Sequence, residues 1–431
     1  MKFKIKNASF VKVILLIVTL GGFFISTLNL SNFIYYIADI LNVILLIFSI
    51  NKIRKKMNIA NFKILYLNIV IFILITIIGI ILNNVSIIEF SWGIRNVYRY
   101  FIFMISCIVL LKPGDVESII NLILKLFWIN LAFTLVEYFI FKIRGDFLGG
   151  IFGIAKGCNG MTSIFINVVI AIIISNYLSK NISLRKTCIY VLAYFTITAL
   201  AEIKANFIFF IVLVIIALMV AKKNRRIIIL GIVALLSVFI GINLLQIYFP
   251  NSVKYLLDMN KANSYMDASY FEHTTFTRNS SLKVANRYFF KENKELYMFG
   301  YGIGACDTSR FFSSDFYKTY GDMNYRQYGV AMMVLQNGYL GLISYFMFFI
   351  LSAYYVLKNN NSINNKNRAY ISMIVSTAVF SIIYSFYASL LIDSSYFIYF
   401  IMAIPYIILK NRNDVLDLQV KNNTEVLECK I

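Results

Sequence analysis

Two short stretches of this sequence carry charged side chains at spacings that suit anion chemistry. In "IRNVYRYF", Arg95 and Arg99 are four residues apart, so on a helix they lie one above the other on a single face. Two guanidinium groups one turn apart suit phosphate oxygens, and the alternative is a pair of anchors to lipid head groups. In "ALAEIKANF", Glu202 and Lys204 place an acid and a base two residues apart. Their apolar flanks indicate that the pair faces a cavity between helices, and a solvated turn is the alternative.

A third stretch, "MFGYGIGACDTSRFF" (298–312), contains Gly300, Gly302 and Gly304 in a chain that has only 20 glycines. Glycine-rich nucleotide loops follow a strand and open a helix, and neither flank here has that pattern. We therefore expect these glycines to form a tight turn with φ values that other residues avoid.

Basic residues also precede the glycines. Arg278 and Arg287 flank "NSSLKVAN", and this stretch predicts an amphipathic helix at about 280–290. His273, the single histidine, lies in a polar loop just before it. A histidine in such a place is more typical of a surface residue than of a catalyst.

These stretches belong to a chain with the composition of a membrane protein. Hydrophobic residues make up 60% of the sequence, charged residues 14%, and the mean hydropathy is +0.75, whereas soluble chains carry about a quarter charged residues. Continuous apolar runs of about 20 residues recur along the whole length, which predicts a helical bundle and not a β-barrel. We predict an all-α polytopic membrane protein, a single integral-membrane domain over 1–431, with about twelve transmembrane helices. The expected spans are 10–30, 33–50, 62–83, 95–111, 117–141, 162–178, 187–201, 205–221, 227–247, 338–357, 369–388 and 395–410.

The charges of the loops predict the orientation. Every second loop is basic, and together with Lys2, Lys4 and Lys6 this places both termini in the cytoplasm. The basic loops are 51–58, 111–118, 179–186, 221–226 and 358–368. The same rule accounts for the net charge of +21 without a nucleic-acid partner. The C-terminal tail, 411–431, is then cytoplasmic, and the protein is a multi-pass protein of the cytoplasmic membrane.

One large extracytoplasmic loop follows from this topology. It runs between the ninth and tenth helices, over about 248–337, and it contains the glycine turn. Its content of Tyr, Phe and Met predicts an ordered structure over the outer mouth of the bundle.

The cysteines and loop acids give no metal-binding pattern. Cys158 and Cys306 fall in loops predicted outside, and we expect two free thiols, with a disulfide as the alternative. We expect no metal, although Asp307, Asp315 and Asp322 are acids of the large loop that offer oxygen ligands.

In the order of these motifs the chain resembles the bacterial O-antigen and capsular polysaccharide polymerases and the related O-antigen ligases. The run "TRNSSLKVANRYFFKENKELYMFGYGIG" (277–304) is similar to the arginine, amphipathic helix and glycine turn of that family. "RGDFLGGIFGIAKGCNGMTS" (144–163) is similar to an earlier outer loop, and "AEIKANF" stands where members carry a basic residue at the tip of a helix pair. "LQNGYLGLISYF" (335–346) stands where the family has a histidine–asparagine pattern. The ligases carry the histidine where this chain has Gln336, before Asn337, which favours a polymerase.

The resemblance implies a membrane glycosyltransferase that polymerises polyprenyl-pyrophosphate-linked oligosaccharide repeat units into a surface polysaccharide, O-antigen or capsule, at the outer face of the cytoplasmic membrane. It implies membrane lipids, a chain-length regulator and a flippase as partners. Cations aimed at the leaving pyrophosphate stabilise its growing charge without a metal or other cofactor. The catalytic candidates are Arg278, Lys204, Glu202 and Asp322, the two acids being candidates for the base. The candidates for binding substrate are Arg95, Arg99, Gly300, Tyr301, Gly302, Gly304, Gln336 and Asn337.

Other functions stay open at this point. Tyr301, Phe311, Phe312 and Tyr317 either stack on sugar rings or form the core of the large loop. A ligase-type glycan transferase shares nearly every feature except the histidine. A lipid-linked oligosaccharide flippase is expected to show two similar halves, and a secondary transporter is expected to show inverted repeats with broken helices at the membrane centre.

Overall fold

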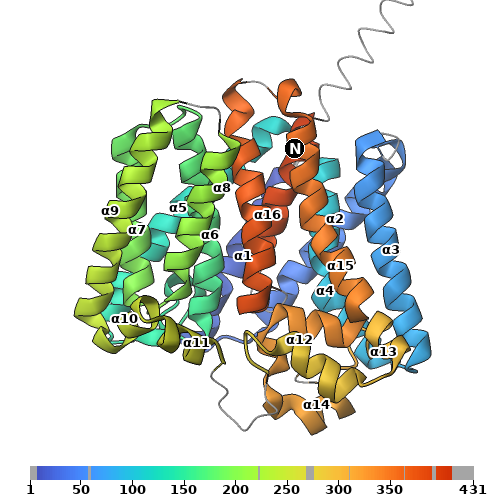
Figure 1. Ribbon diagram of the computed structural model, residues 1–431. Coiled ribbons are helices and arrows are strands. Elements are labelled where there is room, and N and C mark those ends of the chain that lie inside the picture. The colour runs from blue at the N-terminus through green and yellow to red at the C-terminus, as the bar shows by residue number, and fades with distance from the viewer. Residues whose placement is uncertain are drawn as a thin grey trace, which may run out of the picture.

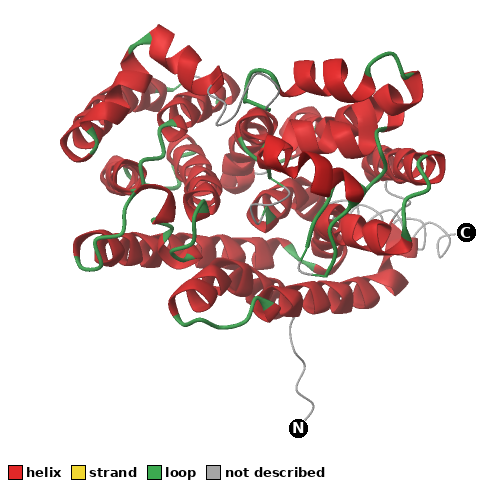
Figure 2. Ribbon diagram, turned by 90° about the horizontal axis from the view of Figure 1, so that it is seen from below, coloured by secondary structure: helices red, strands yellow, loops and turns green. Residues whose placement is uncertain are grey.

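The computed structural model describes residues 7–56, 60–221, 224–267, 276–309, 311–363, 365–390 and 395–409. Over these ranges the elements are helices, and the only strand-like pairing is one bridge between Thr308 and Ser313 (Figure 2). The all-α prediction is confirmed. Nine helices of the described ranges are long and apolar enough to cross a membrane, so this is a polytopic membrane protein. His273 and the predicted tail at 411–431 lie outside the described residues.

A bundle of long helices forms most of the molecule (Figure 1). Its helices are α1 (Asn7–Thr27), α2 (Phe33–Lys56), α3 (Ala60–Leu82), α4 (Ile87–Leu110), α5 (Pro113–Phe139), α6 (Cys158–Leu178), α7 (Leu184–Leu200), α8 (Ala205–Val220), α9 (Arg225–Tyr248), α15 (Gly329–Lys358), α16 (Ala369–Tyr387) and a last apolar helix at Tyr396–Leu409. A helix occupies each range that the sequence predicted as a span. Shorter helices, namely α7, α8 and Tyr396–Leu409, fill the ranges that the nine long ones leave.

Two helices, α4 and α15, begin eight or more residues earlier than predicted. α4 begins at Ile87 because Ser86 and Glu89 form a capping box, in which the Ser86 side chain accepts from the Glu89 N–H and the Glu89 carboxylate accepts from the Ser86 N–H. α15 begins at Gly329 and is interrupted at Gly338, where φ is 63° and ψ is −171°. The predicted start at 338 is therefore the position of a break inside a longer helix.

Burial separates the centre of the bundle from its rim. In α6, 89% of the span is buried, against 17% in α9. The outward face of α9 carries Leu235 and Phe239, whose side chains are 76% and 67% exposed. Contiguous apolar surface of this kind is not stable in water, and on a membrane protein it is the surface that meets lipid.

The two ends of the bundle differ in character. The described residues of the turns after α6, α8 and α15, namely 179–183, 221, 224, 359–363 and 365–368, lie together at one end, the upper end in Figure 1, which we call the basic end. The described residues between α9 and α15, namely 249–267, 276–309 and 311–328, lie at the opposite end and are called the late segment. The structure therefore places the basic turns and the late segment at opposite ends of the bundle, as the charge pattern predicted.

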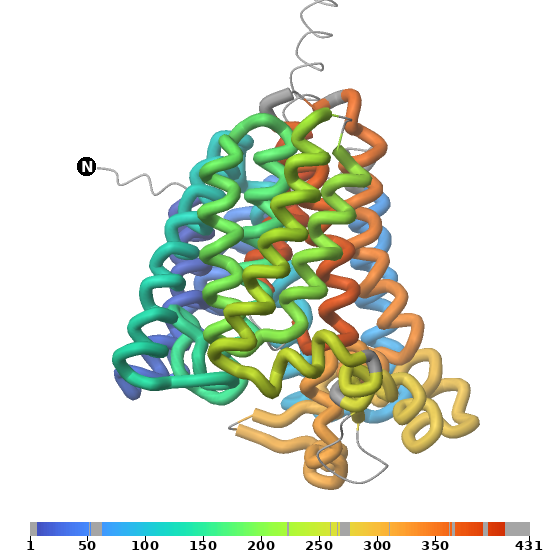
Figure 3. The backbone as a smooth tube through the Cα atoms, turned by 60° about the vertical axis from the view of Figure 1, so that its left-hand side comes forward, coloured from blue at the N-terminus to red at the C-terminus, as the bar shows by residue number. Residues whose placement is uncertain are grey.

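Short helices build the late segment. They are α10 (Pro250–Leu257), α11 (Met259–Asp267), α12 (Ser281–Val284), the π-helical turn η3 (Ala285–Phe290), α13 (Lys294–Phe299) and α14 (Asp315–Tyr320). Figure 3 shows α10 lying across the ends of the bundle helices. The stretch predicted as an amphipathic helix is helical as α12 and η3. The late segment ends at 328 and not at the predicted 337, because α15 already starts at Gly329.

Aromatic rings form the core of the late segment. The Phe316 ring lies 5.2 Å from that of Phe289, 5.0 Å from that of Tyr320 and 5.4 Å from that of Tyr325. Tyr325 is fully buried and donates to the carbonyl of Cys306. Ring pairs at these spacings are favourable beyond the area they bury, so the segment has a small core of its own.

Candidate functional site

An ion-pair cluster of Asp39, Arg95 and Arg99, called the arginine cluster, lies between α2 and α4. Arg95 Nη2 and Nε lie 2.6 Å and 2.8 Å from Asp39 Oδ2, and Arg99 Nη1 lies 4.0 Å from Asp39 Oδ1. The predicted sharing of one helix face is confirmed, since both arginines reach the same carboxylate. They lie about two and three turns inside α4, deeper than predicted, because that helix starts at Ile87. One carboxylate against two guanidinium groups leaves the cluster with excess positive charge.

Arg95 is the more accessible cation of this cluster. Its side chain is 24% exposed, and its guanidinium carbon lies 4.8 Å from the centre of the Tyr36 ring and 4.7 Å from that of Trp92. Arg99 instead donates to the Tyr100 hydroxyl at 2.8 Å, within the bundle. Arg95 thus combines a partly exposed positive charge with two aromatic faces.

The late segment adds aromatic rings to this place. The rings of Phe311 and Phe312 meet that of Trp92 edge to face at 6.2 Å and 6.1 Å. Phe311 is 75% exposed. In contrast, Tyr301 donates to the carbonyl of Phe289 and packs on Phe316, so it belongs to the core of the segment. Of the aromatics singled out in the sequence, Phe311 therefore offers the open face that a sugar ring needs.

Asp307 connects the late segment to α4. Its side chain is fully buried, accepts from Asn96 Nδ2 at 3.1 Å and lies 3.7 Å from Arg326 Nε. Burial raises the pKa of the Asp307 carboxyl, and the positive charge of Arg326 and the side chains of Asn96 and Gln336 oppose this rise. Asn96 stands next to Arg95 in the sequence, so this contact couples the late segment to the arginine cluster.

The predicted glycine turn is confirmed as a turn with positive φ. Gly300, Gly302 and Gly304 have φ of 69°, 93° and 85°. Their backbone docks on the first part of α15, where the N–H groups of Tyr301 and Gly302 donate to the carbonyls of Leu335 and Gln336 at 2.7 Å and 3.0 Å. The turn is therefore held by the bundle itself.

Glycines of the bundle meet the glycines of the turn. A Cβ on Gly93 of α4 would lie 2.5 Å from Gly304 N, and one on Gly79 of α3 would lie 2.9 Å from Phe299 O. A Cβ on Gly338 would overlap Met298 O. Backbone meets backbone at every one of these places, and we call the whole contact the glycine junction. Its glycines are buried, so their visible role is close packing and not contact with a ligand.

Gln336 and Asn337 lie inside α15, directly before its break at Gly338, and not in a loop. Both are buried, with exposures of 1% and 0%. Asn337 Oδ1 accepts from Thr76 of α3 at 3.3 Å, and Thr76 in turn accepts from Tyr98 of α4. Asn337 thus joins the broken helix to α3 and α4.

Glu202 and Lys204 form an ion pair of 3.0 Å at the turn between α7 and α8. The Glu202 carboxylate also accepts from Ser252 of α10, and Lys204 lies 5.4 Å from the centre of the Tyr255 ring. The side chains are 26% and 16% exposed. The pair is therefore half-buried beneath α10 and not a fully solvated turn, while the cavity expected beside it stays a prediction.

Buried polar side chains hold this turn in place. Asn206 Oδ1 accepts from Ser163 and Asn167 of α6 at 2.5 Å and 2.9 Å, and Tyr194 of α7 donates to Asn206 O. Tyr194 also donates to Asn167 Oδ1. These bonds fix the start of α8, and hence Lys204, against the centre of the bundle.

Arg278 reaches the same end of α8. Its guanidinium carbon lies 4.6 Å from the centre of the Tyr387 ring at the end of α16, and that ring lies 5.6 Å from the ring of Phe209 in α8. Arg278 is half-buried, whereas Arg287 is exposed beside Tyr288. The structure thus separates the two arginines that flank the predicted helix.

The three acids of the late segment that could offer oxygen ligands, Asp307, Asp315 and Asp322, have separate surroundings. Asp322 is exposed, Asp315 pairs with Lys318 at 2.7 Å, and Asp307 is buried against Arg326. In the described part of the chain no group of three or more His, Cys, Asp and Glu side chains has metal-binding geometry. The predicted free thiols are confirmed, because Cys158 and Cys306 are both buried and unbridged.

Glu137, an acid within an apolar span, accepts a hydrogen bond from the backbone of the loop at 140–157. Glu137 Oε2 accepts from the N–H of Gly150 at 2.8 Å, and Asn130 Oδ1 accepts from that of Ile151 at 3.1 Å. Both side chains come from α5 and are buried. They supply the acceptors that a buried turn needs, so the loop folds back between α1, α5 and α6.

The structure brings the predicted residues into three places and not one: the arginine cluster, the glycine junction and the pair at the start of α8 with Arg278 nearby. Sequence reasoning missed Trp92, Asn96 and Arg326. Trp92 and Asn96 lie within one turn of Arg95, so the helical face around that arginine was the available signal. No sequence signal indicated Arg326.

No protein-family model matches this chain, and no curated protein matches it in sequence. The resemblance to polysaccharide polymerases therefore supplies a hypothesis, which the geometry above can support or weaken.

Proposed function

We propose that this protein polymerises polyprenyl-pyrophosphate-linked oligosaccharide repeat units at the outer face of the cytoplasmic membrane. The observation that carries the proposal is the meeting of Arg95, Trp92 and Phe311, where an accessible cation and open aromatic rings lie at the late-segment end of the bundle. A pyrophosphate-linked sugar needs both, a cation for its phosphate oxygens and a ring face for its sugar.

The proposed topology follows from the same end. The basic end faces the cytoplasm and the late segment faces outward, because cytoplasmic loops retain Lys and Arg. All the bundle helices, including α7, α8 and Tyr396–Leu409, then cross the membrane, about twelve crossings in total. Both termini are cytoplasmic in this arrangement.

The reaction forms one bond and breaks one. The hydroxyl oxygen of the acceptor sugar attacks the anomeric carbon of the donor sugar, and the bond from that carbon to the pyrophosphate oxygen breaks. Polyprenyl pyrophosphate leaves with the electron pair, and the hydroxyl proton passes to a carboxylate. Glu202 is the better base candidate, since it is half-buried beside Lys204 whereas Asp322 is exposed. Arg278 and Lys204, which lie with Glu202 at the start of α8, supply positive charge for the leaving group, and Arg95 in the separate arginine cluster holds the pyrophosphate of the other lipid-linked unit.

A ligase-type transferase is the second candidate. Gln336, at the position where the ligases have a histidine, is 1% exposed and carries a neutral amide that does not accept a proton at physiological pH. This residue supports polymerisation over a ligase reaction that depends on the histidine.

A transporter would use a broken helix to bind its substrate. α15 is broken at Gly338, but the backbone of Met298 and Phe299 fills the break. The break therefore holds the late segment in place, which argues against a substrate site there.

The test uses lipid-linked repeat units isolated from a host strain that lacks this gene. Purified protein in proteoliposomes is expected to convert them into a ladder of longer chains with release of polyprenyl pyrophosphate, and Arg95→Gln to lose about a hundredfold or more in rate. Arg287→Gln, an exposed arginine of the late segment, is the matched control and is expected to keep the wild-type rate.

Other products would change the assignment. Transfer of single units onto a different lipid acceptor would indicate a ligase. Failure of wild-type protein to consume the lipid-linked units would remove the proposal.

A further inference from the structure

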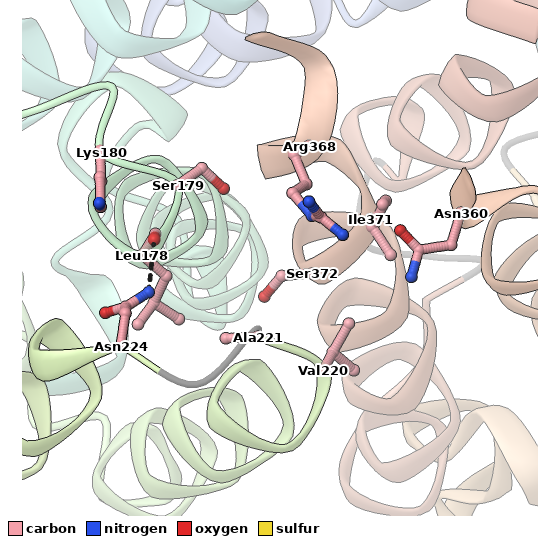
Figure 4. Close-up of a pocket in the computed structure, with 10 residues that line it drawn as sticks. All are labelled: Leu178, Ser179, Lys180, Val220, Ala221, Asn224, Asn360, Arg368, Ile371 and Ser372. Atoms are coloured by element: carbon pink, nitrogen blue, oxygen red, sulfur yellow. Dashed lines mark hydrogen bonds between the residues drawn. The ribbon is translucent and has the colours of Figure 1, made fainter. Parts of the chain in front are cut away.

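A cavity of about 390 Å³ lies at the basic end, on the far side of the bundle from the sites above. Figure 4 shows Ser179 and Lys180, just after α6, across the cavity from Arg368 and Ser372 at the start of α16. The volume is several times that of a water molecule, which occupies about 30 Å³ in the liquid. The cavity is large enough for a phosphate group with a small substituent.

The lining of this cavity is positive. Among the described residues that line it, Lys180 and Arg368 carry charge and none is an acid. The neighbouring Arg226 is used differently: its Nη1 donates to the carbonyls of Tyr177 and Ile182 at 2.8 Å and 2.9 Å. Arg226 therefore covers carbonyl groups at the end of α6, while Lys180 and Arg368 form no ion pair within the described part of the chain.

Two buried polar atoms of the lining have no partner. Ser372 is 5% exposed, and its Oγ has no hydrogen-bond partner in the described chain. The same holds for Asn360 Oδ1. A buried hydroxyl left without a partner is destabilising, so a ligand that bonds to Ser372 would be favoured. Ser372 also lies in the first turn of α16, where the positive end of the helix dipole adds to the two cations.

We propose that this cavity binds a phosphate group between Arg368, Lys180 and Ser372. Arg368 and Lys180 donate charge-assisted hydrogen bonds to its oxygens, Ser372 donates a third, and Asn360 Oδ1 accepts from a hydroxyl on the ligand. The group comes either from the head group of an anionic lipid or from a soluble phosphate. This site is separate from the proposed glycan chemistry and does not depend on it.

The experiment measures binding to the full-length protein in detergent micelles with two probes. Native mass spectrometry counts bound phosphatidylglycerol, with phosphatidylcholine as the zwitterionic comparison, and the thermal unfolding midpoint is followed against added inorganic phosphate. We expect Arg368→Gln to weaken binding about tenfold or more and Ser372→Ala to weaken it severalfold. Arg185→Gln, which removes an exposed charge at the same end from α7, is expected to leave binding unchanged.

Selective retention of phosphatidylglycerol assigns the lipid source, and a midpoint shift with inorganic phosphate assigns the soluble one. Both results support the site if Arg368→Gln and Ser372→Ala reduce them. Equal binding by wild type and these variants, an equal loss in Arg185→Gln, or binding of neither probe overturns it. If Arg368→Gln lowers the yield of folded protein, Ser372→Ala and Lys180→Gln are used in its place, because Ser372 is uncharged and Lys180 is exposed.

Discussion

Substitution of Gly304 by alanine tests whether the glycine junction needs a close approach of two backbones. The φ of Gly304 is +85°, where a Cβ costs roughly 1–2 kcal/mol. The new Cβ would also overlap the carbonyl of Glu89 in α4, a backbone group that cannot rotate away. Overpacking of this kind typically adds about 1–3 kcal/mol. We therefore expect Gly304→Ala to lower the free energy of unfolding by about 2–5 kcal/mol.

Gly157→Ala is the matched control. Gly157 has the same φ of +85°, but nothing lies within 4 Å of the position its Cβ would take. Gly157→Ala should lower the free energy of unfolding by roughly 1–2 kcal/mol, which is the cost of the backbone conformation alone. Both losses are measured by titrating the purified protein in micelles with SDS. Equal losses of unfolding free energy in the two variants would refute the reasoning, because the backbone conformation would then account for the whole loss in Gly304→Ala.

Three further predictions follow from topology, charge and burial. An impermeant maleimide should label Thr319→Cys on intact cells but not Asn361→Cys, and the reverse result would invert the proposed orientation. Arg278→Ala should slow chain elongation on the order of a hundredfold to a thousandfold, with little rescue by Arg278→Lys and a near-normal Arg287→Ala; normal long chains from the first variant on a surface-glycan gel would remove Arg278 from the site. Because burial raises the pKa of Asp307, the folded state holds a proton that the unfolded state has released, so the free energy of unfolding should fall as pH rises above about 4. Asp307→Asn should flatten this slope in SDS titrations at several pH values, and identical slopes would contradict the assignment.

Local pattern in the sequence predicted the parts of the fold that depend on neighbours along the chain. Apolar runs predicted where helices lie, and the spacing of Arg95 and Arg99 predicted their common face. The start of α4 lies ahead of the apolar run that predicts the span, and the capping-box pattern of Ser86 and Glu89 is the local signal that marks it.

Contacts between distant segments were beyond the reach of one sequence. Asp39 is a charged residue within a predicted span, but its pairing with Arg95 depends on the packing of α2 against α4. Asp307 accepts from Asn96 across a sequence separation of 211 residues. Gly79 and Gly93 did carry a usable signal, since a lone glycine within an apolar helix often marks a close approach.

The glycine junction joins segments of the chain that are synthesised at different times. Gly93 leaves the ribosome roughly 200 residues before Gly304 and still earlier than the broken helix around Gly338, a delay of ~10–40 s at about 5–20 residues per second. During that interval α3 and α4 are already in the bilayer, with their glycine faces turned to lipid or to whichever helix arrives first. α2 precedes α4 in the chain and packs against it, so this contact does not depend on the late partner. A chain that stops before Gly329 would lack α15, and the side of α3 that packs on α15 would stay uncovered.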